Sequence, residues 1–166
     1  MGIRRMTAGI RQLRGRMHKD YRPNDDVYTP SYIFDALKLE FDLDVCGPAG
    51  GLDWIPAKKT FSEQDDGLIQ QWYGRVWMNP PYSKPSPWVD KWLENANGVM
   101  IAPYSKSHWF MKLWNSQAVM LNNPVNFKFI RGIDRTNCSI AFPTAIWAIG
   151  ETNITALKMS NLGRVR

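Results

Sequence analysis

A short apolar run that ends in two prolines constrains the fold more than any other feature of this chain. Val76-Trp77-Met78 is typical of a buried strand, and the next four residues are Asn79-Pro80-Pro81-Tyr82. Proline cannot donate to a β-ladder, so the chain must leave the sheet at this point. Ligands of open α/β sheets bind beyond the carboxyl ends of the strands. We therefore expect the motif Asn79–Tyr82 to lie at a functional edge of a sheet.

The rest of the chain alternates between strand and helix patterns. Apolar and alternating runs predict strands over 41–46, 58–61, 75–78, 98–102, 118–121, 125–130 and 140–149. Helices are expected to begin near residues 29–31, 87 and 107, and the stretch Ser62–Trp72 predicts a turn or a short helix. This alternation predicts an α/β fold of one domain, with a mostly parallel sheet and helices on both faces.

The positive charge of the chain is concentrated near its start. The formal net charge is +6, residues 1–19 carry six basic and no acidic side chains, and the remainder is balanced. We predict a basic arm over 1–26, one domain over 27–150, and a C-terminal tail over 151–166. The tail is expected to pack loosely on the domain or to trail from it. Such an arm suits a polyanion, because each phosphate contact releases counterions; the alternative is a solvated leader.

Composition narrows the class of protein. The chain is 44% hydrophobic and 22% charged, which is typical of a globular domain and not of a disordered segment. Cys46 and Cys138 are too few for a disulfide framework and have no metal-ligand spacing, so we expect a reduced, cytoplasmic protein without a metal site. Its apolar runs are too short to cross a bilayer, and no membrane span is expected.

The motif after the buried strand suits one chemical task. The side-chain oxygen of Asn79 can accept one hydrogen of a planar exocyclic amine, and the carbonyl of Pro80 can accept the other. Two fixed acceptors favour the positive charge that develops as such a nitrogen attacks an electrophile. The ring of Tyr82 offers a surface on which a base can stack. The alternative is an ordinary loop of two prolines, with Pro81 serving only to stiffen the turn.

The chain resembles the Asn/Asp-Pro-Pro-Tyr methyltransferases, and within them the phage-type DNA N6-adenine branch. The resemblance is carried by Tyr28-Thr29-Pro30, Leu43–Cys46, Phe61–Leu68 with Trp72, Val76–Tyr82, Gly132 and Ala141–Thr144. It implies a Rossmann-like methyltransferase domain that uses S-adenosylmethionine and transfers a methyl group to N6 of adenine in DNA. It also implies a phage protein that protects DNA from restriction in the host cytoplasm.

The resemblance also assigns candidate residues. The motif Asn79–Tyr82 would be catalytic, and the cofactor would contact Thr29, Pro30, Asp44, Cys46, Gly47, Phe61 and Asp66. Arg11, Arg14 and Arg16 of the arm, together with Lys84, would contact DNA. Several have structural alternatives: a helix cap for Thr29 or Asp66, a core position for Phe61, and an exposed strand end for Asp44. The loop Gly47–Gly51 departs from the usual Gly-x-Gly spacing, so its alternative is a tight strand-to-helix turn.

Other functions remain open from the sequence. The target could be another planar nitrogen, such as cytosine N4, RNA adenine or a protein glutamine. A protein from a different class is also possible, namely a non-catalytic nucleic-acid- or cofactor-binding protein with a decayed methyltransferase fold. The loosened glycine loop favours this last alternative, and the intact Asn79–Tyr82 motif argues against it.

Overall fold

A computed structural model describes residues 22–122 and 127–166. The elements along the chain are β1 (Val27–Tyr28), α2 (Ser31–Leu37), β2 (Phe41–Asp44), β3 (Ala57–Thr60), β4 (Val76–Met78), α3 (Ser86–Asn95), β5 (Gly98–Pro103), α4 (His108–Trp114), β6 (Val119–Asn122), β7 (Phe129–Arg131), β8 (Asn137–Cys138), β9 (Thr144–Ile149), α5 (Glu151–Met159) and β10 (Arg164–Val165). The described chain is therefore a mixed α/β structure, as the sequence predicts.

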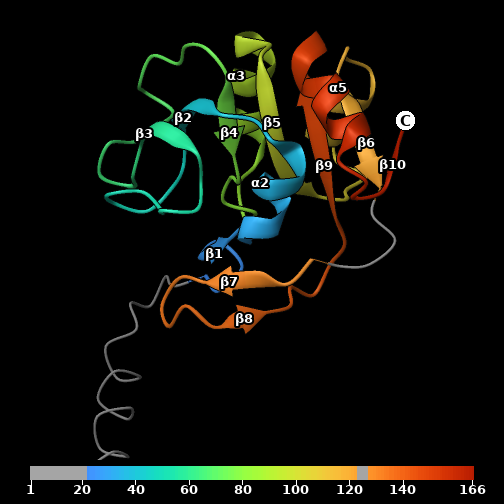
Figure 1. The fold of residues 1–166 in the computed structure, drawn as a ribbon. Helices are drawn as coiled ribbons and strands as arrows, with labels where there is room; N and C mark the ends of the chain where they lie inside the picture. Colours follow the sequence, from blue (N-terminus) through green and yellow to red (C-terminus); the bar gives the residue numbers. More distant parts are fainter. Residues whose placement is uncertain (1–21, 123–126) are drawn as a thin grey trace, which may run out of the picture.

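Seven strands form the main sheet, in the order β10-β6-β9-β5-β4-β2-β3 (Figure 1). The four strands β3, β2, β4 and β5 are parallel to one another, which agrees with the predicted parallel sheet. The other half is antiparallel, because β9 pairs antiparallel with both β5 and β6, and β10 pairs antiparallel with β6. The complete sheet is thus mixed, and its parallel half carries the strand ends at which the sequence predicts a site.

Helices cover both faces of this sheet. On one face, α2 and α5 pack over Phe41, Trp77, Ile101 and Ile146. On the other face, α3 and α4 pack over the alternate residues of the same strands, which include Leu43, Val76, Met100 and Trp147. This alternation follows from the strand period of two. Trp77 is fully enclosed and meets the ring of Phe34 edge-on at 4.7 Å between centroids, which fixes α2 over β4.

A second, three-stranded sheet in the order β1-β7-β8 lies beyond the carboxyl ends of the parallel strands (Figure 1). In β1, Val27 pairs with Arg131 of β7 and Tyr28 pairs with Ile130, both antiparallel. The strand β7 begins at Phe129, later than the predicted start at residue 125, and the predicted residues 125–126 lie outside the described part of the chain. The last long strand also begins later than predicted, at Thr144, since Pro143 cannot donate to a ladder.

The C-terminal residues are part of the fold. Helix α5 packs on the sheet with Leu157 completely buried, and β10 extends the sheet beside β6. The side chain of Asn153 is also completely buried, where it donates to Asn97 and accepts from Arg75. The loose packing that the sequence predicts for this segment is therefore not observed.

Candidate active site

The motif Asn79–Tyr82 begins directly after β4, at the carboxyl edge of the parallel strands. The Nδ2 of Asn79 donates to the carbonyl oxygen of Val27 at 2.8 Å. Because that carbonyl can only accept, the amide must turn its nitrogen toward β1 and its oxygen away. The Oδ1 atom of Asn79 is buried and has no hydrogen-bond partner among the described residues. The fold thus presents an oriented acceptor at the atom where the sequence predicts one.

Tyr82 is enclosed more fully than a stacking platform open to solvent would be. Only 9% of it is exposed, and its ring lies edge-on against Phe142 at 5.8 Å and Phe129 at 6.4 Å between centroids. Burial raises the pKa of its hydroxyl well above the usual range. The hydroxyl has no hydrogen-bond partner within the described chain. A base can therefore reach a face of this ring only if a neighbouring side chain moves.

Asp44 lies at the end of β2, next to β4 in the sheet, and is only 2% exposed. Its Oδ1 accepts from the backbone N–H of Cys46 at 3.4 Å. Burial raises the pKa of the Asp44 carboxyl to about 7, and the Cys46 hydrogen bond opposes the shift only partly. The predicted alternative of an exposed strand-end carboxylate does not hold, because Asp44 is only 2% exposed. No cation among the described residues contributes to its pKa shift, and a buried carboxyl of this kind is suited to receive a cation from a ligand.

Cys46 connects Asp44 to the motif. Burial and the neighbouring Asp44 carboxyl raise the pKa of its thiol well above the usual range, whereas a backbone hydrogen bond from Asn79 lowers it. The thiol is therefore neutral near pH 7 and is not an activated nucleophile. The strand ends of β2 and β4 thus bring Asp44, Cys46, Asn79 and Tyr82 together.

Gly47 is required by the space beside Asp44. A Cβ on Gly47 would collide with Oδ2 of Asp44 and lie 2.6 Å from Cγ2 of Thr60. Its amide donates to the carbonyl of Phe61 at 3.1 Å, so this N–H is already occupied by the backbone. Gly47 therefore contributes the absence of a side chain, which leaves room for Asp44 and Thr60.

Thr29 and Pro30 lie between β1 and α2. Pro30 occupies the N-cap position and no side chain caps the helix, so the predicted cap at Thr29 is not formed. The hydroxyl of Thr29 is instead buried without a hydrogen-bond partner among the described residues, and its carbonyl accepts from Trp54 at 2.9 Å. The cap alternative for this residue is therefore excluded, and its hydroxyl is available to a ligand.

Residues 61–72 form turns, without the short helix that the sequence left open. Phe61 is buried in the core on the α3 side, with Lys59 Nζ 4.9 Å from its ring centroid. Asp66 is exposed, and its Oδ1 accepts from the N–H of Leu68 at 3.2 Å, so it does not cap a helix. The turn is held on α3 by Lys91, whose Nζ donates to the carbonyls of Leu68 and Gln70. Sequence reasoning did not single out Lys91.

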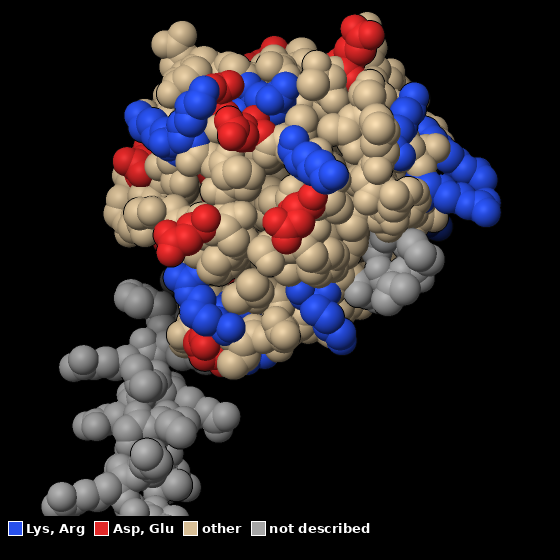
Figure 2. All heavy atoms as spheres, in the orientation of Figure 1, with Lys and Arg blue, Asp and Glu red and all other residues tan. Residues whose placement is uncertain are grey.

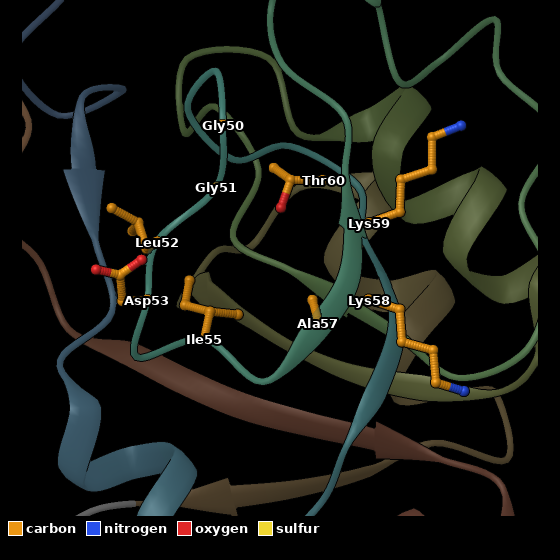
Figure 3. Close-up of a pocket in the computed structure, with 9 residues that line it drawn as sticks. All are labelled: Gly50, Gly51, Leu52, Asp53, Ile55, Ala57, Lys58, Lys59 and Thr60. Carbon is orange, nitrogen blue, oxygen red and sulfur yellow. The ribbon is translucent and has the colours of Figure 1, made fainter.

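A hollow of about 390 Å³ lies between the glycine loop and β3. Figure 3 shows Thr60 on the side of Gly50 and Gly51, whereas Lys58 and Lys59 extend away from the loop. Thr60 is the register partner of Asp44, so the hollow adjoins the buried carboxyl.

Of the four residues predicted to contact DNA, the structure describes only Lys84. Arg11, Arg14 and Arg16 lie outside the described residues. Lys84 is exposed just past the motif. Figure 2 shows basic and acidic side chains interspersed on the visible face of the domain. Within residues 22–122 and 127–166, no group of three or more His, Cys, Asp or Glu could hold a metal ion. In the same two ranges, no helix is long and apolar enough to cross a bilayer.

The described residues form a mixed α/β structure with the sequence Asn-Pro-Pro-Tyr at the carboxyl edge of its parallel strands, which is consistent with a methyltransferase-like fold. The chain belongs to the DNA N-6-adenine-methyltransferase (Dam) family, whose model matches residues 17–152. This match confirms the resemblance found in the sequence.

Two curated relatives are similar to the chain. The DNA N-6-adenine-methyltransferase of Haemophilus phage HP1 is 35% identical over 66 residues, which cover 37% of this chain and 36% of the relative. The DNA N-6-adenine-methyltransferase of Escherichia phage T1 is 25% identical over 130 residues, which cover 69% of this chain and 53% of the relative. The alignments thus span about a third and about half of the relatives' lengths. No solved structure matches the chain.

Proposed function

We propose that this protein transfers a methyl group from S-adenosylmethionine to the N6 amine of adenine in DNA, and that its described residues form a Rossmann-like methyltransferase domain. The family and the two phage relatives support this activity. The observation that carries the proposal is the Asn79 amide, anchored to Val27 through Nδ2 with its buried Oδ1 left unpartnered. An acceptor fixed in this way suits an amine donor that arrives with the substrate.

The residues around Asp44 fit the cofactor. The cofactor supplies an electrophilic methyl group on a sulfonium and carries a cationic amino group. The buried Asp44 carboxyl is suited to hold that cationic end, and the unpartnered hydroxyl of Thr29 offers a further polar contact. Phe61 is buried in the core, so its predicted contact with the cofactor is less favoured by the structure. Asp66 is exposed on the adjoining turn and is the candidate for contact with the adenine amine of the cofactor.

The motif then acts on the target base. Oδ1 of Asn79 and the carbonyl of Pro80 each accept one hydrogen of the target amine and favour the positive charge that develops on its nitrogen. The target adenine leaves the duplex stack to reach them, as base-modifying enzymes require. Tyr82 stacks on this base after the segment that carries Phe142 moves aside. The neutral Cys46 thiol has no nucleophilic role.

The test is Asn79→Ala, with methyl transfer from labelled cofactor to unmodified DNA measured alongside calorimetric cofactor binding. We expect turnover to fall by roughly 100- to 1000-fold, the usual effect of removing one preorganised group. Cofactor affinity should be retained. Asn95→Ala is the matched control, because the Asn95 amide also donates to backbone carbonyls but lies at the end of α3. Near-normal turnover in Asn79→Ala would refute the proposed role.

Nucleoside analysis of the product distinguishes the target. N6-methyladenine in DNA supports the proposal, whereas N4-methylcytosine, methylated RNA or methylated protein would replace it. Cofactor binding without transfer to any of these would favour the non-catalytic alternative.

A further inference from the structure

The Asp25 carboxylate, which the sequence analysis does not single out, accepts two hydrogen bonds from the far end of the loop Asn79–Ser83. Asp25 lies just before β1, and Ser83 directly follows Tyr82. The backbone N–H of Ser83 donates to Oδ1 of Asp25 at 2.8 Å, and the Ser83 hydroxyl donates to Oδ2. Both hydrogen-bond donors of Ser83, its N–H and its hydroxyl, are thus bound to one side chain 58 residues away in the sequence. Ser83 is therefore not free to contact the DNA backbone.

The same segment holds both ends of the loop. Val27 O receives the Asn79 amide at the start of the motif, and Asp25 receives Ser83 at its end. Pro80 and Pro81 between them have no backbone N–H. The loop is therefore attached to the segment Asp25–Val27 through Asn79 and Ser83.

The segment is itself well fixed. Val27 and Tyr28 pair with β7, and the N–H of Gly132 donates to the carbonyl of Asp26 at 2.9 Å. Asp25 is thus held at the edge of a sheet and not on a free strand end. Hydrogen bonds to an ionised acceptor are stronger than neutral ones, so a carboxylate at this position stabilises the loop more than a neutral group would.

We infer that Asp25 is a positioning residue that acts through Ser83 to hold Asn79 and Tyr82 in place for methyl transfer. This inference rests on the proposed function. Asp25 touches neither the target base nor the cofactor site in this assignment, so its loss should lower turnover without weakening cofactor binding. A displacement of about 1 Å at a reacting group costs up to about 100-fold in rate.

The experiment compares Asp25→Ala with Asp25→Asn in the full chain. The alanine variant removes both acceptors, and we expect kcat on DNA to fall by about 10- to 100-fold with the Kd for S-adenosylmethionine unchanged. The asparagine variant keeps both contacts, because its oxygen accepts from the Ser83 amide and its NH₂ donates to the Ser83 hydroxyl. Its kcat should stay within about threefold of wild type. Asp90→Ala is the control, since it removes a surface ion pair with Lys112 between α3 and α4.

Ser83→Ala supplies a second test that does not depend on the folding of Asp25→Ala. It removes one of the two bonds and should lower kcat by about three- to tenfold, again at constant cofactor affinity. Normal turnover in both Asp25→Ala and Ser83→Ala, or a loss of cofactor binding that accounts for the lost activity, overturns the inference alone. An inactive wild-type protein would instead overturn the proposed function and the inference with it.

Discussion

The buried carboxyl of Asp44 should make the stability of the protein fall as the pH rises from about 4 to about 7, because burial disfavours the ionised form. The pKa of Asp44 is raised from 3.8 to about 7 in the folded state, chiefly by burial. The folded chain therefore holds a proton between these two values that the unfolded chain releases. This contribution to stability is complete below pH ~4 and is lost as the pH rises through about 7.

The size of the effect follows from the difference between the folded and unfolded pKa of Asp44. Between pH 5 and pH 8 the wild type should lose about 3 kcal/mol of unfolding free energy relative to Asp44→Asn, because one pKa unit corresponds to about 1.4 kcal/mol. For a chain of this length that is a relative change in Tm of roughly 5–10 °C. The asparagine oxygen can still accept from Cys46, so the variant should be nearly isosteric.

Thermal unfolding of both proteins from pH 5 to pH 8 measures this difference. Asp42→Asn on the same strand is the control, since a hydrogen bond from Lys58, then one from the backbone of Arg75, lowers the pKa of Asp42. That variant should be less stable than the wild type at pH 8, which is the opposite sign. Parallel pH profiles for wild type and Asp44→Asn would refute the assignment of a buried, proton-holding carboxyl.

In calorimetry, Asp44→Asn should also bind S-adenosylmethionine at least tenfold more weakly, since a hydrogen bond to a charged group is worth roughly 1.5–3 kcal/mol.

Two further predictions concern the ends of the chain. Leu157→Ala should lower the unfolding free energy in denaturant titrations by about 2–5 kcal/mol, because its side chain is completely buried, whereas the exposed Met159 on the same helix should tolerate alanine within about 0.5 kcal/mol; a loss below about 1 kcal/mol at Leu157 would mean that α5 is not integral to the fold. Deletion of residues 1–19 should weaken DNA binding and reduce the slope of log K against log salt by about 0.9 for each lost phosphate contact. An unchanged slope would mean that the arm does not bind phosphates and is a solvated leader.

The parts of the site that sequence could predict are those with a local signal. Val76–Met78 is an apolar run and the prolines after it stop the ladder, so the place of Asn79 at a strand end follows from neighbouring residues. The groups that hold Asn79 and Ser83 come from residues 52 and 58 positions away. One of them is the carbonyl of Val27, and a backbone atom leaves no mark in a sequence. Only the folded sheet brings these groups to the loop.

The sequence pattern predicts no helix over Glu151–Met159, where the structure has α5. Its apolar face is narrow, and one of its two buried residues is Asn153. That amide donates to Asn97 and to the carbonyl of Ile149 and accepts from Arg75. Hydrophobic periodicity in the sequence does not reveal a helix that is held in place partly by buried hydrogen bonds between polar side chains. The turn over 61–72 is a similar case, since Lys91 holds it through two backbone carbonyls.

The polar groups left unpartnered at the carboxyl edge connect stability to function. Within the described chain, the buried hydroxyls of Thr29 and Tyr82 and the Oδ1 of Asn79 lack hydrogen bonds, and Asp44 has one weak backbone bond. Native proteins seldom leave such groups unsatisfied, because each costs about 1–3 kcal/mol. The indole nitrogens of Trp92 and Trp147 are also unpartnered, but they lie among apolar side chains on the α3 side of the sheet. Asp44 and Asn79, by contrast, stand at the ends of the neighbouring strands β2 and β4, and Tyr82 follows in the same loop. A ligand that brings an amine and a cationic group would satisfy them together, so the folded chain bears a cost that binding removes. Asp44→Asn should therefore be more stable without a ligand above pH 7 and gain less Tm on addition of S-adenosylmethionine than the wild type does.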